Sequence, residues 1–585
     1  MELDENPWAD DQTVQTRLGS SDGSDGDTAG LKPPFMPSRS TINKSNKTPA
    51  HRQPPQRSPA KQSYIGGQTR DLVYGVCIVN FHHLRGPEIE YSNLAEHPGF
   101  DLSSVWPYLP FQALPDGAHS FEETFSCFTL QYPGDASTRP TTLFAISCAR
   151  QIASNELLEK DKDVTRSSVQ KAIVVILKQP IYGQIKEKLS IVTKAFFEQK
   201  NFADKVIVDV LFQSLQAIYS EDATSVDESD FYAGLSLREL VRDFKKDVLT
   251  VIKAMMLEKK IAFYGSDPTK LCATEFAFIS LIPNLINNLL DCSSPSLDNY
   301  TKQIKPTSSF QTPDRNSVLA FAGLPLQIFG EGGVFSPYSP LQQFEELKKV
   351  DYYLMGTSNA LLLNQKQAMC DVLVNLDTST VEVINHDLIQ PLQLTSPDKK
   401  WMSQIVSSVS ASCAEGYSGF LGSDDYIRLQ FEDYLTGFLA SVKYNNLISR
   451  FDGVPPSELV TKEYDHSQLK YFNVNFVNMW KQTHNYSLFN RITDDHLFDV
   501  FEPRHIYVEE GKSLSERFQV FKMENTKKFD DYRKGLLAKE SKDNLKLKTD
   551  LEKVNDPSSS ESAKSKSPGK LWGWYSRRKE RDSDQ

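Results

Sequence analysis

The segment Leu72–Phe81 reads LVYGVCIVNF, and His82-His83-Leu84-Arg85-Gly86-Pro87-Glu88-Ile89-Glu90-Tyr91 follows it directly. A run of β-branched and aromatic residues of this length predicts a strand. Gly-Pro is a turn signal, and the residues from Glu88 to Tyr91 then alternate polar and apolar, which predicts a second strand. The segment therefore predicts a β-hairpin.

The pattern continues beyond the hairpin. Three further apolar runs predict strands, namely Ser126–Gln131, Leu143–Cys148 and Ala172–Leu177. After Gly183 the apolar residues change to helical spacing, at Ile185, Leu189, Val192, Phe196 and Phe197. We therefore expect a small α/β domain over residues 71–200.

A second α/β domain is expected over residues 201–395. Ser236 and Glu239 form a capping box, and the helix that it starts is expected to carry apolar positions as far as Met255. Another helix is predicted over 274–290. Strands are predicted at Lys260–Tyr264, Leu326–Phe329, Tyr352–Met355, Asn359–Leu363 and Asp371–Leu376.

The remaining segments are predicted from spacing and composition. Residues 396–520 place apolar side chains at helical spacing and are expected to be mostly helical, and 521–556 are expected to form one charged helix. The Ser-, Pro- and charge-rich segments 1–70 and 557–585 are predicted to be disordered tails.

Charge narrows the range of partners. The net charge is −11, and the tails 1–70 and 557–585 carry +1 and +3, which leaves −15 for residues 71–556. An acidic body opposes binding to phosphate backbones, so no nucleic-acid partner is expected. The widely spaced cysteines predict reduced thiols, and the absence of a long apolar run predicts a cytoplasmic protein with at most peripheral membrane contact.

Motifs for catalysis are missing. Gly511-Lys512-Ser513 resembles the end of a phosphate-binding loop, but Ile506 stands where the first glycine is required. Ser418 lacks the last glycine of a nucleophile elbow. We therefore expect no catalytic residue, no cofactor, no metal site and no small-molecule substrate.

Several segments resemble a known family. Residues 80–90, NFHHLRGPEIE, and residues 114–119, LPDGAH, are similar to the upstream DENN domain of Avl-type proteins of the late secretory pathway. YLMGTSN at 353–359 and DVLVNLD at 371–377 resemble the end of a central DENN domain. Phe431-Glu432-Asp433-Tyr434 and the segment from Trp480 to Tyr486 are similar to the family's helical downstream region. The resemblance extends from about residue 71 to 500.

The resemblance implies a tripartite DENN module: a longin-like α/β domain, an α/β central domain and a helical downstream domain. It implies a role in transport from the Golgi to the cell surface, on Golgi-derived or secretory membranes. By analogy with the superfamily, it also implies binding to a Rab-class small GTPase and promotion of GDP release. A noncatalytic Rab effector or trafficking scaffold with the same fold remains the alternative.

Two segments are candidate contact sites. His82, His83 and Arg85 either contact a protein partner or stabilise the hairpin turn. In the C-terminal tail, aromatic rings stand beside cations and suit an anchor on anionic lipid, a short docking motif being the alternative. The residues of this candidate tail site are Trp572, Trp574, Tyr575, Arg577 and Arg578.

Overall fold

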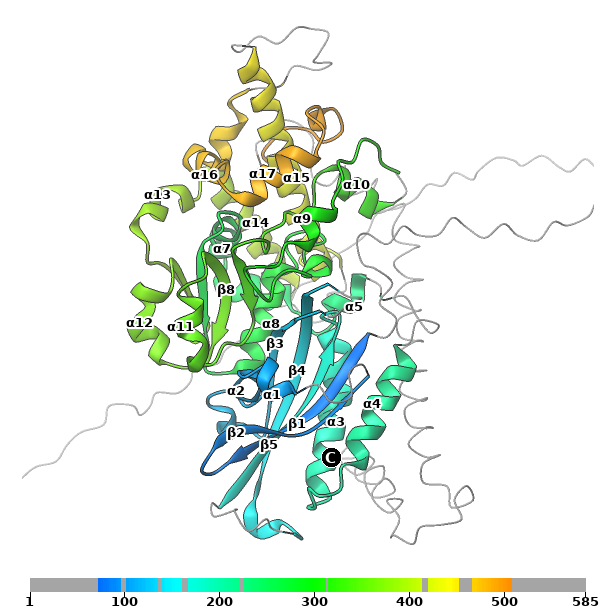
Figure 1. Cartoon of the computed structure of the whole chain (residues 1–585). Coiled ribbons are helices and arrows are strands. Elements are labelled where there is room, and N and C mark those ends of the chain that lie inside the picture. Colours follow the sequence, from blue (N-terminus) through cyan, green and yellow to red (C-terminus); the bar gives the residue numbers. More distant parts are fainter. Residues whose placement is uncertain are drawn as a thin grey trace, which may run out of the picture. The chain divides into compact units, whose positions relative to one another are not determined.

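The computed structural model describes most of the chain between residues 72 and 507 (Figure 1). The described ranges are 72–95, 101–134, 139–159, 167–219, 226, 228–311, 314–412, 419–451, 464 and 466–507. The predicted tails 1–70 and 557–585 and the predicted charged helix 521–556 lie outside these ranges. The described residues form two five-stranded sheets and a set of helices.

The first sheet is antiparallel, with the strand order β2-β1-β5-β4-β3. Its strands are β1 (Val73–His82), β2 (Gly86–Leu94), β3 (Glu123–Tyr132), β4 (Thr141–Ala153) and β5 (Ser168–Leu177). Strands β1 and β2 pair directly on either side of a turn at residues 83–85. The predicted hairpin and the three further predicted strands are thus confirmed.

Helices cover both faces of the first sheet. Alternate residues of a strand point to opposite faces, so Val76 and Ile78 pack with one set of helices and Tyr74 and Cys77 with another. The first set comprises α3 (Tyr182–Glu198) and α4 (Val206–Ile218), and the second comprises α1 (Leu102–Val105) and α2 (Leu109–Ala113). Both faces of the sheet are therefore buried.

The second sheet has the order β10-β9-β6-β8-β7 and is parallel except for β10. Its strands are β6 (Lys260–Tyr264), β7 (Gly333–Ser336), β8 (Tyr352–Thr357), β9 (Val372–Asn375) and β10 (Thr380–Val383). The helices of this region are α5 (Glu228–Tyr232), α6 (Leu237–Phe244), α7 (Asp247–Met256), α8 (Pro268–Ile279), α9 (Asn299–Gln303), α10 (Arg315–Phe321), α11 (Phe344–Leu347), α12 (Leu361–Met369) and α13 (Ile389–Leu392). Helices α7 and α8 pack on one face of the sheet, and α11 and α12 pack on the other.

Four predictions in this region were wrong. Leu326–Phe329 is not a strand, and the edge strand is β7, which begins seven residues later in the sequence than predicted. Asn359–Leu363 is not a strand either, because Oδ1 of Asn359 accepts the backbone N–H of Leu361 and the chain turns into α12. The single helix predicted after Ser236 is divided into α6 and α7 at Lys245, whose φ of 52° is incompatible with a continuous helix.

The predicted range for helix α8 lay too far towards the C-terminus. It begins at Pro268, where the side chain of Asp267 accepts the backbone N–H of Thr269, and it ends at Ile279. Proline at the first helical position and aspartate before it form a strong start signal. The predicted range 274–290 missed this start and extended past Pro283, which cannot continue a helix.

The last described part is helical, as predicted. It consists mainly of α14 (Ser396–Ser412), α15 (Asp424–Arg450), α16 (Val474–Trp480) and α17 (His484–Ile492). It is tied to α7 by a buried ion pair in which Nζ of Lys253 lies 2.6 Å from Oδ2 of Asp398. The hydroxyl of Tyr434 and Nε2 of His505 lie 3.1 Å and 3.0 Å from the other oxygen of Asp398. Of the helices in the described ranges, none has the length and apolar character needed to cross a bilayer.

We expect the central region to depend on its neighbours for folding. One apolar cluster extends from Leu72, just before β1, to Ile506 and includes side chains of both sheets and of the helical part. Limited proteolysis is therefore expected to leave one large fragment that begins near residue 70. Release of a stable fragment 204–395 would contradict this expectation.

Candidate functional site

The carboxyl ends of three parallel strands meet at one edge of the second sheet. Ser266 follows β6, Ser358 and Asn359 follow β8, and Asp377 follows β9. The backbone N–H and the hydroxyl of Ser266 both donate to Oδ1 of Asp377, at 3.0 and 3.1 Å. The helices after β6 and β8 lie on opposite faces of the sheet. In open α/β sheets such an arrangement creates a crevice in which ligands bind.

Here a turn from the first sheet region occupies that edge. Asp116 donates its backbone N–H to the Tyr338 hydroxyl at 2.7 Å, and its carbonyl accepts the hydroxyl of Ser358 at 2.7 Å. Its carboxylate accepts Nδ2 of Asn359 at 2.8 Å. The next residue, Gly117, has a φ of 82°, which a side chain would strain. The turn therefore takes the place at which a ligand would be expected.

Tyr338 is the buried centre of this junction. Its side chain is inaccessible to solvent, and burial raises the pKa of its hydroxyl far above the usual value. The neutral hydroxyl lies 3.1 Å from Oγ of Ser358 while it accepts the N–H of Asp116. The hydroxyl of Ser358 already donates its proton to the carbonyl of Asp116, so the Tyr338 hydroxyl donates its own proton to Oγ of Ser358. The Tyr338 hydroxyl therefore acts both as a donor and as an acceptor.

Further hydrogen bonds join β3 to strand β7 of the second sheet and to helix α8. The Thr129 hydroxyl donates to the carbonyl of Phe335 at 2.7 Å, and the backbone N–H of Phe125 donates to Oγ1 of Thr269 at 3.0 Å. Thr129 is buried, so its bond to Phe335 forms in a water-poor environment. We call the surface around Asp116, Tyr338, Ser358 and Asn359 the junction surface. Asp116 lies exposed on it.

The junction surface unites segments that were predicted separately. The motif LPDGAH at 114–119 contributes Asp116, and YLMGTSN at 353–359 contributes Ser358 and Asn359. The third motif, DVLVNLD at 371–377, ends in Asp377 at the same edge of the sheet. Tyr338 was not among the residues predicted from the sequence. The available signal was a tyrosine between the two prolines of Ser336-Pro337-Tyr338-Ser339-Pro340, next to strand β7.

The hairpin residues lie elsewhere, at the turn between β1 and β2. Nδ1 of His82 accepts the backbone N–H groups of Leu84 and Arg85, each at 3.2 Å, and the ring is buried. Arg85 is exposed and donates to both carboxylate oxygens of Glu88, at 2.8 and 2.7 Å. His82 thus stabilises the turn directly. Arg85 and the partly exposed His83 remain accessible to a partner.

Alanine substitutions are expected to separate these roles. His82→Ala removes the acceptor of two backbone N–H groups and should lower the free energy of unfolding by about 1–3 kcal/mol. Arg85→Ala removes an exposed ion pair and should lower it by less than about 1 kcal/mol. Urea denaturation measures both changes. If binding to a GTPase falls no further than the stability loss explains, the partner role of these residues is wrong.

Cysteine chemistry gives no support for catalysis in the described part of the chain. The described cysteines, Cys77, Cys127, Cys148, Cys272, Cys292 and Cys370, are all buried and free. Burial raises the pKa of Cys77 and of Cys370 to about 12. A thiol with such a pKa is neutral at physiological pH and a poor nucleophile. Among the described residues, no group of three or more His, Cys, Asp or Glu side chains is placed to hold a metal ion.

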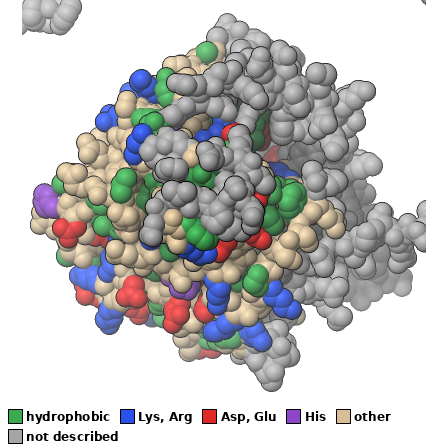
Figure 2. Space-filling view, turned by 90° about the horizontal axis from the view of Figure 1, so that it is seen from above, with side chains coloured by type: hydrophobic (Ala, Val, Ile, Leu, Met, Phe, Trp, Pro, Cys, Tyr) green, Lys and Arg blue, Asp and Glu red, His purple; other side chains and the backbone are tan. Residues whose placement is uncertain are grey.

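Positively and negatively charged side chains lie side by side on one face of the molecule. On the face shown in Figure 2, Lys and Arg side chains of the described residues are interspersed with Asp and Glu side chains. Trp572, Trp574, Tyr575, Arg577 and Arg578, the candidate tail site, lie outside the described residues, as do Ser418 and Gly511-Lys512-Ser513. The predictions about them therefore remain predictions.

The fold and the junction define a protein with two sheets, joined through their edge strands β3 and β7, and a helical part that packs on helix α7. Residues 73–442 match the family whose model is described as Avl9: Transport protein Avl9, so the chain belongs to this family. It is 47% identical over 463 residues to the late secretory pathway protein AVL9 of Saccharomyces cerevisiae, which covers 74% of the chain and 60% of the yeast protein. It is 38% identical over 442 residues to the late secretory pathway protein avl9 of Schizosaccharomyces pombe, which covers 74% of the chain and 90% of that protein.

Proposed function

We propose that this protein regulates late secretory transport by binding a Rab-class GTPase and promoting GDP release. The proposal includes a tripartite DENN organisation, in which the first sheet, the second sheet and the helical part are the three units. The observation that carries it is the junction surface, where motifs from two separate sheets form one hydrogen-bonded surface with an exposed aspartate. The relatives' names as late secretory pathway proteins support the cellular process.

Nucleotide exchange requires a surface and no catalytic side chain. An exchange factor binds the nucleotide-free GTPase more tightly than the GDP form and thereby shifts the population of its switch loops. Such a surface must be held rigid, since a mobile one would lose binding free energy on ordering. The buried hydroxyl of Tyr338 and the bonds of Thr129 and Phe125 give the junction this rigidity.

A GDP-release assay tests the proposal. The purified chain is added to each of a panel of secretory Rab proteins loaded with a fluorescent GDP analogue, and accelerated release from at least one is expected. Asp116→Arg reverses a charge on the exposed junction surface and should slow that release roughly tenfold, which corresponds to about 1.4 kcal/mol. Asp499→Arg, at an exposed aspartate of the helical part, is the control. No acceleration with any Rab would refute the exchange activity.

The nucleotide state of the Rab that this protein binds most tightly distinguishes an exchange factor from an effector or scaffold. An exchange factor binds the nucleotide-free form best, whereas an effector binds the GTP form best. Pull-down of one Rab in its empty, GDP and GTP forms gives this order directly. Preference for the GTP form, without accelerated GDP release, would assign the junction surface to an effector.

We further propose that the protein contacts Golgi-derived or secretory membranes peripherally from the cytoplasm, through its C-terminal tail. Trp572 and Trp574 suit the lipid headgroup boundary, and Arg577 and Arg578 suit anionic lipid. Changing both tryptophans to alanine, or deleting residues 570–585, should reduce sedimentation with phosphatidylserine-containing liposomes and leave the thermal unfolding midpoint unchanged. Unchanged liposome binding by the truncated chain would favour a protein-docking motif instead.

A further inference from the structure

Glu275 of α8 carries a carboxyl group that is fully buried, and neither of its oxygens accepts a hydrogen bond from the described residues. The carboxyl group faces Gly356 of β8. A Cβ atom at residue 356 would lie 1.9 Å from Oε1 of Glu275 and 2.4 Å from the carbonyl oxygen of Pro337. The carboxyl group therefore fills the space that the glycine leaves, beside a backbone carbonyl. Buried polar groups without partners are rare in folded proteins, so this one requires an explanation.

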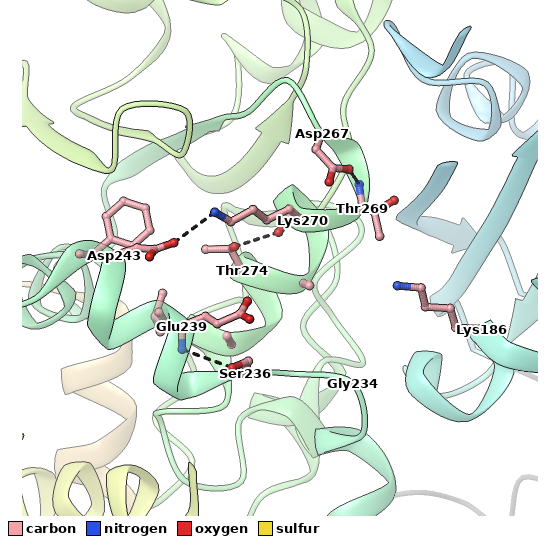
Figure 3. Close-up of a pocket in the computed structure, with 13 residues that line it drawn as sticks. Lys186, Gly234, Ser236, Glu239, Asp243, Asp267, Thr269, Lys270 and Thr274 are labelled. Atoms are coloured by element: carbon pink, nitrogen blue, oxygen red, sulfur yellow. Dashed lines mark hydrogen bonds and ion pairs between the residues drawn. The ribbon is translucent and has the colours of Figure 1, made fainter. Parts of the chain in front are cut away.

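Among the described residues, no cation is placed to neutralise Glu275, and only the thiol of Cys272 affects its titration. The elements that pack on α8 use their charges elsewhere. On α6, Asp243 lines a pocket at the start of α8 and accepts Nζ of Lys270 at 3.1 Å (Figure 3). Lys253 of α7 pairs with Asp398, Glu123 of β3 pairs with Arg150, and Lys260 of β6 donates to the carbonyl of Lys348.

The other titratable groups around this position are thiols and phenols. Burial raises the pKa of Cys272 and of the tyrosines on the neighbouring elements, so these groups are neutral at physiological pH. An ionised Glu275 would be an unpaired charge in these surroundings, which is strongly unfavourable. The groups are Cys272 of α8, Cys127 of β3, Tyr182 of α3, Tyr352 and Tyr353 of β8, and Tyr338.

Glu275 lies behind both segments that build the junction surface. Pro337 directly precedes Tyr338, and Gly356 precedes Ser358 by two residues. The two segments are joined where the backbone N–H of Ser339 donates to the carbonyl of Gly356 at 2.7 Å. A displacement at the Glu275 carboxyl group would therefore reach Tyr338 and Ser358 together.

Helix α8 itself is held firmly at its start. Asp267 accepts the backbone N–H of Thr269 at 2.8 Å, as the dashed line in Figure 3 shows. Oγ1 of Thr269 accepts the backbone N–H of Phe125 in β3 at 3.0 Å. Because α8 is tied to the first sheet, a charge on Glu275 is expected to displace the segments 336–340 and 356–359 rather than the helix.

We propose that Glu275 is a proton-dependent latch beneath the junction surface. While the carboxyl group carries its proton, an O–H can lie between Oε1 and the carbonyl oxygen of Pro337, which would otherwise repel each other. When the proton leaves, a buried negative charge faces that carbonyl, and the two segments separate so that water reaches the charge. Tyr338 and Ser358 then lose their mutual arrangement.

The direction of the pH dependence follows from burial, which raises the pKa of Glu275 well above 4.5. The latch is closed at low pH and opens as the pH rises through the raised folded pKa. A partner that binds the closed junction surface is therefore bound more tightly at lower pH. This effect on binding rests on the proposed function, whereas the latch is a property of the chain alone.

Hydrogen exchange of the full chain, measured by mass spectrometry, tests the latch without any GTPase. The backbone N–H groups of Ser339 and Asp116 report on it, because they bond to the carbonyl of Gly356 and to the hydroxyl of Tyr338. Corrected for the intrinsic exchange rate, their protection should fall by up to about tenfold per pH unit above the folded pKa, the limit for release of one proton. The N–H of Thr269, at the start of α8, is the internal control and should keep its protection.

Glu275→Gln is the matched variant, because an amide keeps the shape and an N–H donor but has no charge. The protection of Ser339 and Asp116 should then be independent of pH. Infrared spectra of the wild type above about pH 6, where exposed carboxyl groups are ionised, should show the band of a protonated carboxyl group, and the variant should lack it. Glu187→Gln, at an exposed position of α3, should behave as the wild type in both measurements. The same pH profile in the wild type and Glu275→Gln, or no protonated band in the wild type, would overturn the proposal.

Discussion

Replacing Asp398 by asparagine is expected to lower the free energy of unfolding by about 3–5 kcal/mol, because the change leaves a buried ammonium group without its anion. The Lys253–Asp398 pair is inaccessible to solvent at both side chains. Nζ of Lys253 has a second acceptor in the carbonyl of Phe472 at 3.3 Å, but that contact brings no charge. The pair connects α7 with α14, so its loss should loosen the helical part first.

The lowered pKa of the Asp398 carboxyl predicts a matching pH dependence of stability. Burial alone would raise the pKa of the Asp398 carboxyl, but the charge of Lys253 and the hydrogen bond from His505 outweigh it and lower the pKa to about 2. A carboxyl with a depressed folded pKa stabilises the protein above its unfolded pKa, near 3.8, and this stabilisation is lost as the pH falls from there toward 2. Wild-type protein should therefore lose stability over this window, and Asp398→Asn should lack that part of the loss.

A variant at a partly exposed ion pair shows how much of the expected stability loss is due to burial of the Lys253–Asp398 pair. Asp425 pairs with Arg428 at 3.1 Å but is about half exposed, so Asp425→Asn should cost less than about 1 kcal/mol. The double variant Lys253→Met with Asp398→Asn should be more stable than Asp398→Asn alone, because no unpaired charge then remains. Urea denaturation of the three variants gives these values. A double variant less stable than Asp398→Asn would contradict the argument.

Local patterns in the sequence predicted those elements whose own residues decide their conformation. The alternation and β-branched runs of Leu72–Phe81 and Ala172–Leu177 led directly to β1 and β5, which lie side by side in the sheet. The capping residue Ser236 was also found, and its Oγ accepts the N–H of Glu239 at 3.2 Å. Such signals act within a few residues, so they can be read without a structure.

Contacts between distant residues could not be predicted in the same way. Lys253 and Asp398 are 145 residues apart, and each is an ordinary charged residue in a helical pattern. Asn359–Leu363 was predicted to be a strand because it is largely apolar. Its first residue instead starts a turn, since Oδ1 of Asn359 accepts the backbone N–H of Leu361. Nδ2 of Asn359 also donates to Asp116, which belongs to the region of the first sheet. The junction surface was therefore visible in the sequence only as separate motifs, and their meeting depends on how the two sheets pack.

Glu275 is a second buried carboxyl, and its position in the fold differs from that of Asp398. It lies on α8 with no exposed surface, against Gly356 of β8, where a Cβ atom would collide with its carboxyl oxygen and with the carbonyl of Pro337. Among the described residues, neither of its oxygens has a hydrogen-bond partner. Burial, with a smaller effect of Cys272, raises the pKa of this carboxyl well above 4.5. The folded protein thus holds Glu275 protonated at pH values at which the unfolded chain ionises it.

Glu275→Gln is therefore expected to gain stability relative to wild type as the pH rises. A raised folded pKa contributes stability below the unfolded pKa, near 4.5, and this contribution declines as the pH rises toward the folded pKa. The decline is at most about 1.4 kcal/mol per pH unit for one proton. Glutamine does not titrate, so the difference between variant and wild type should grow in favour of the variant from pH 4.5 to 7.5. Urea denaturation at four pH values measures this slope, with the exposed change Glu187→Gln as the control for one lost charge. Parallel pH curves for Glu275→Gln and wild type would show that the buried carboxyl is ionised in the folded protein.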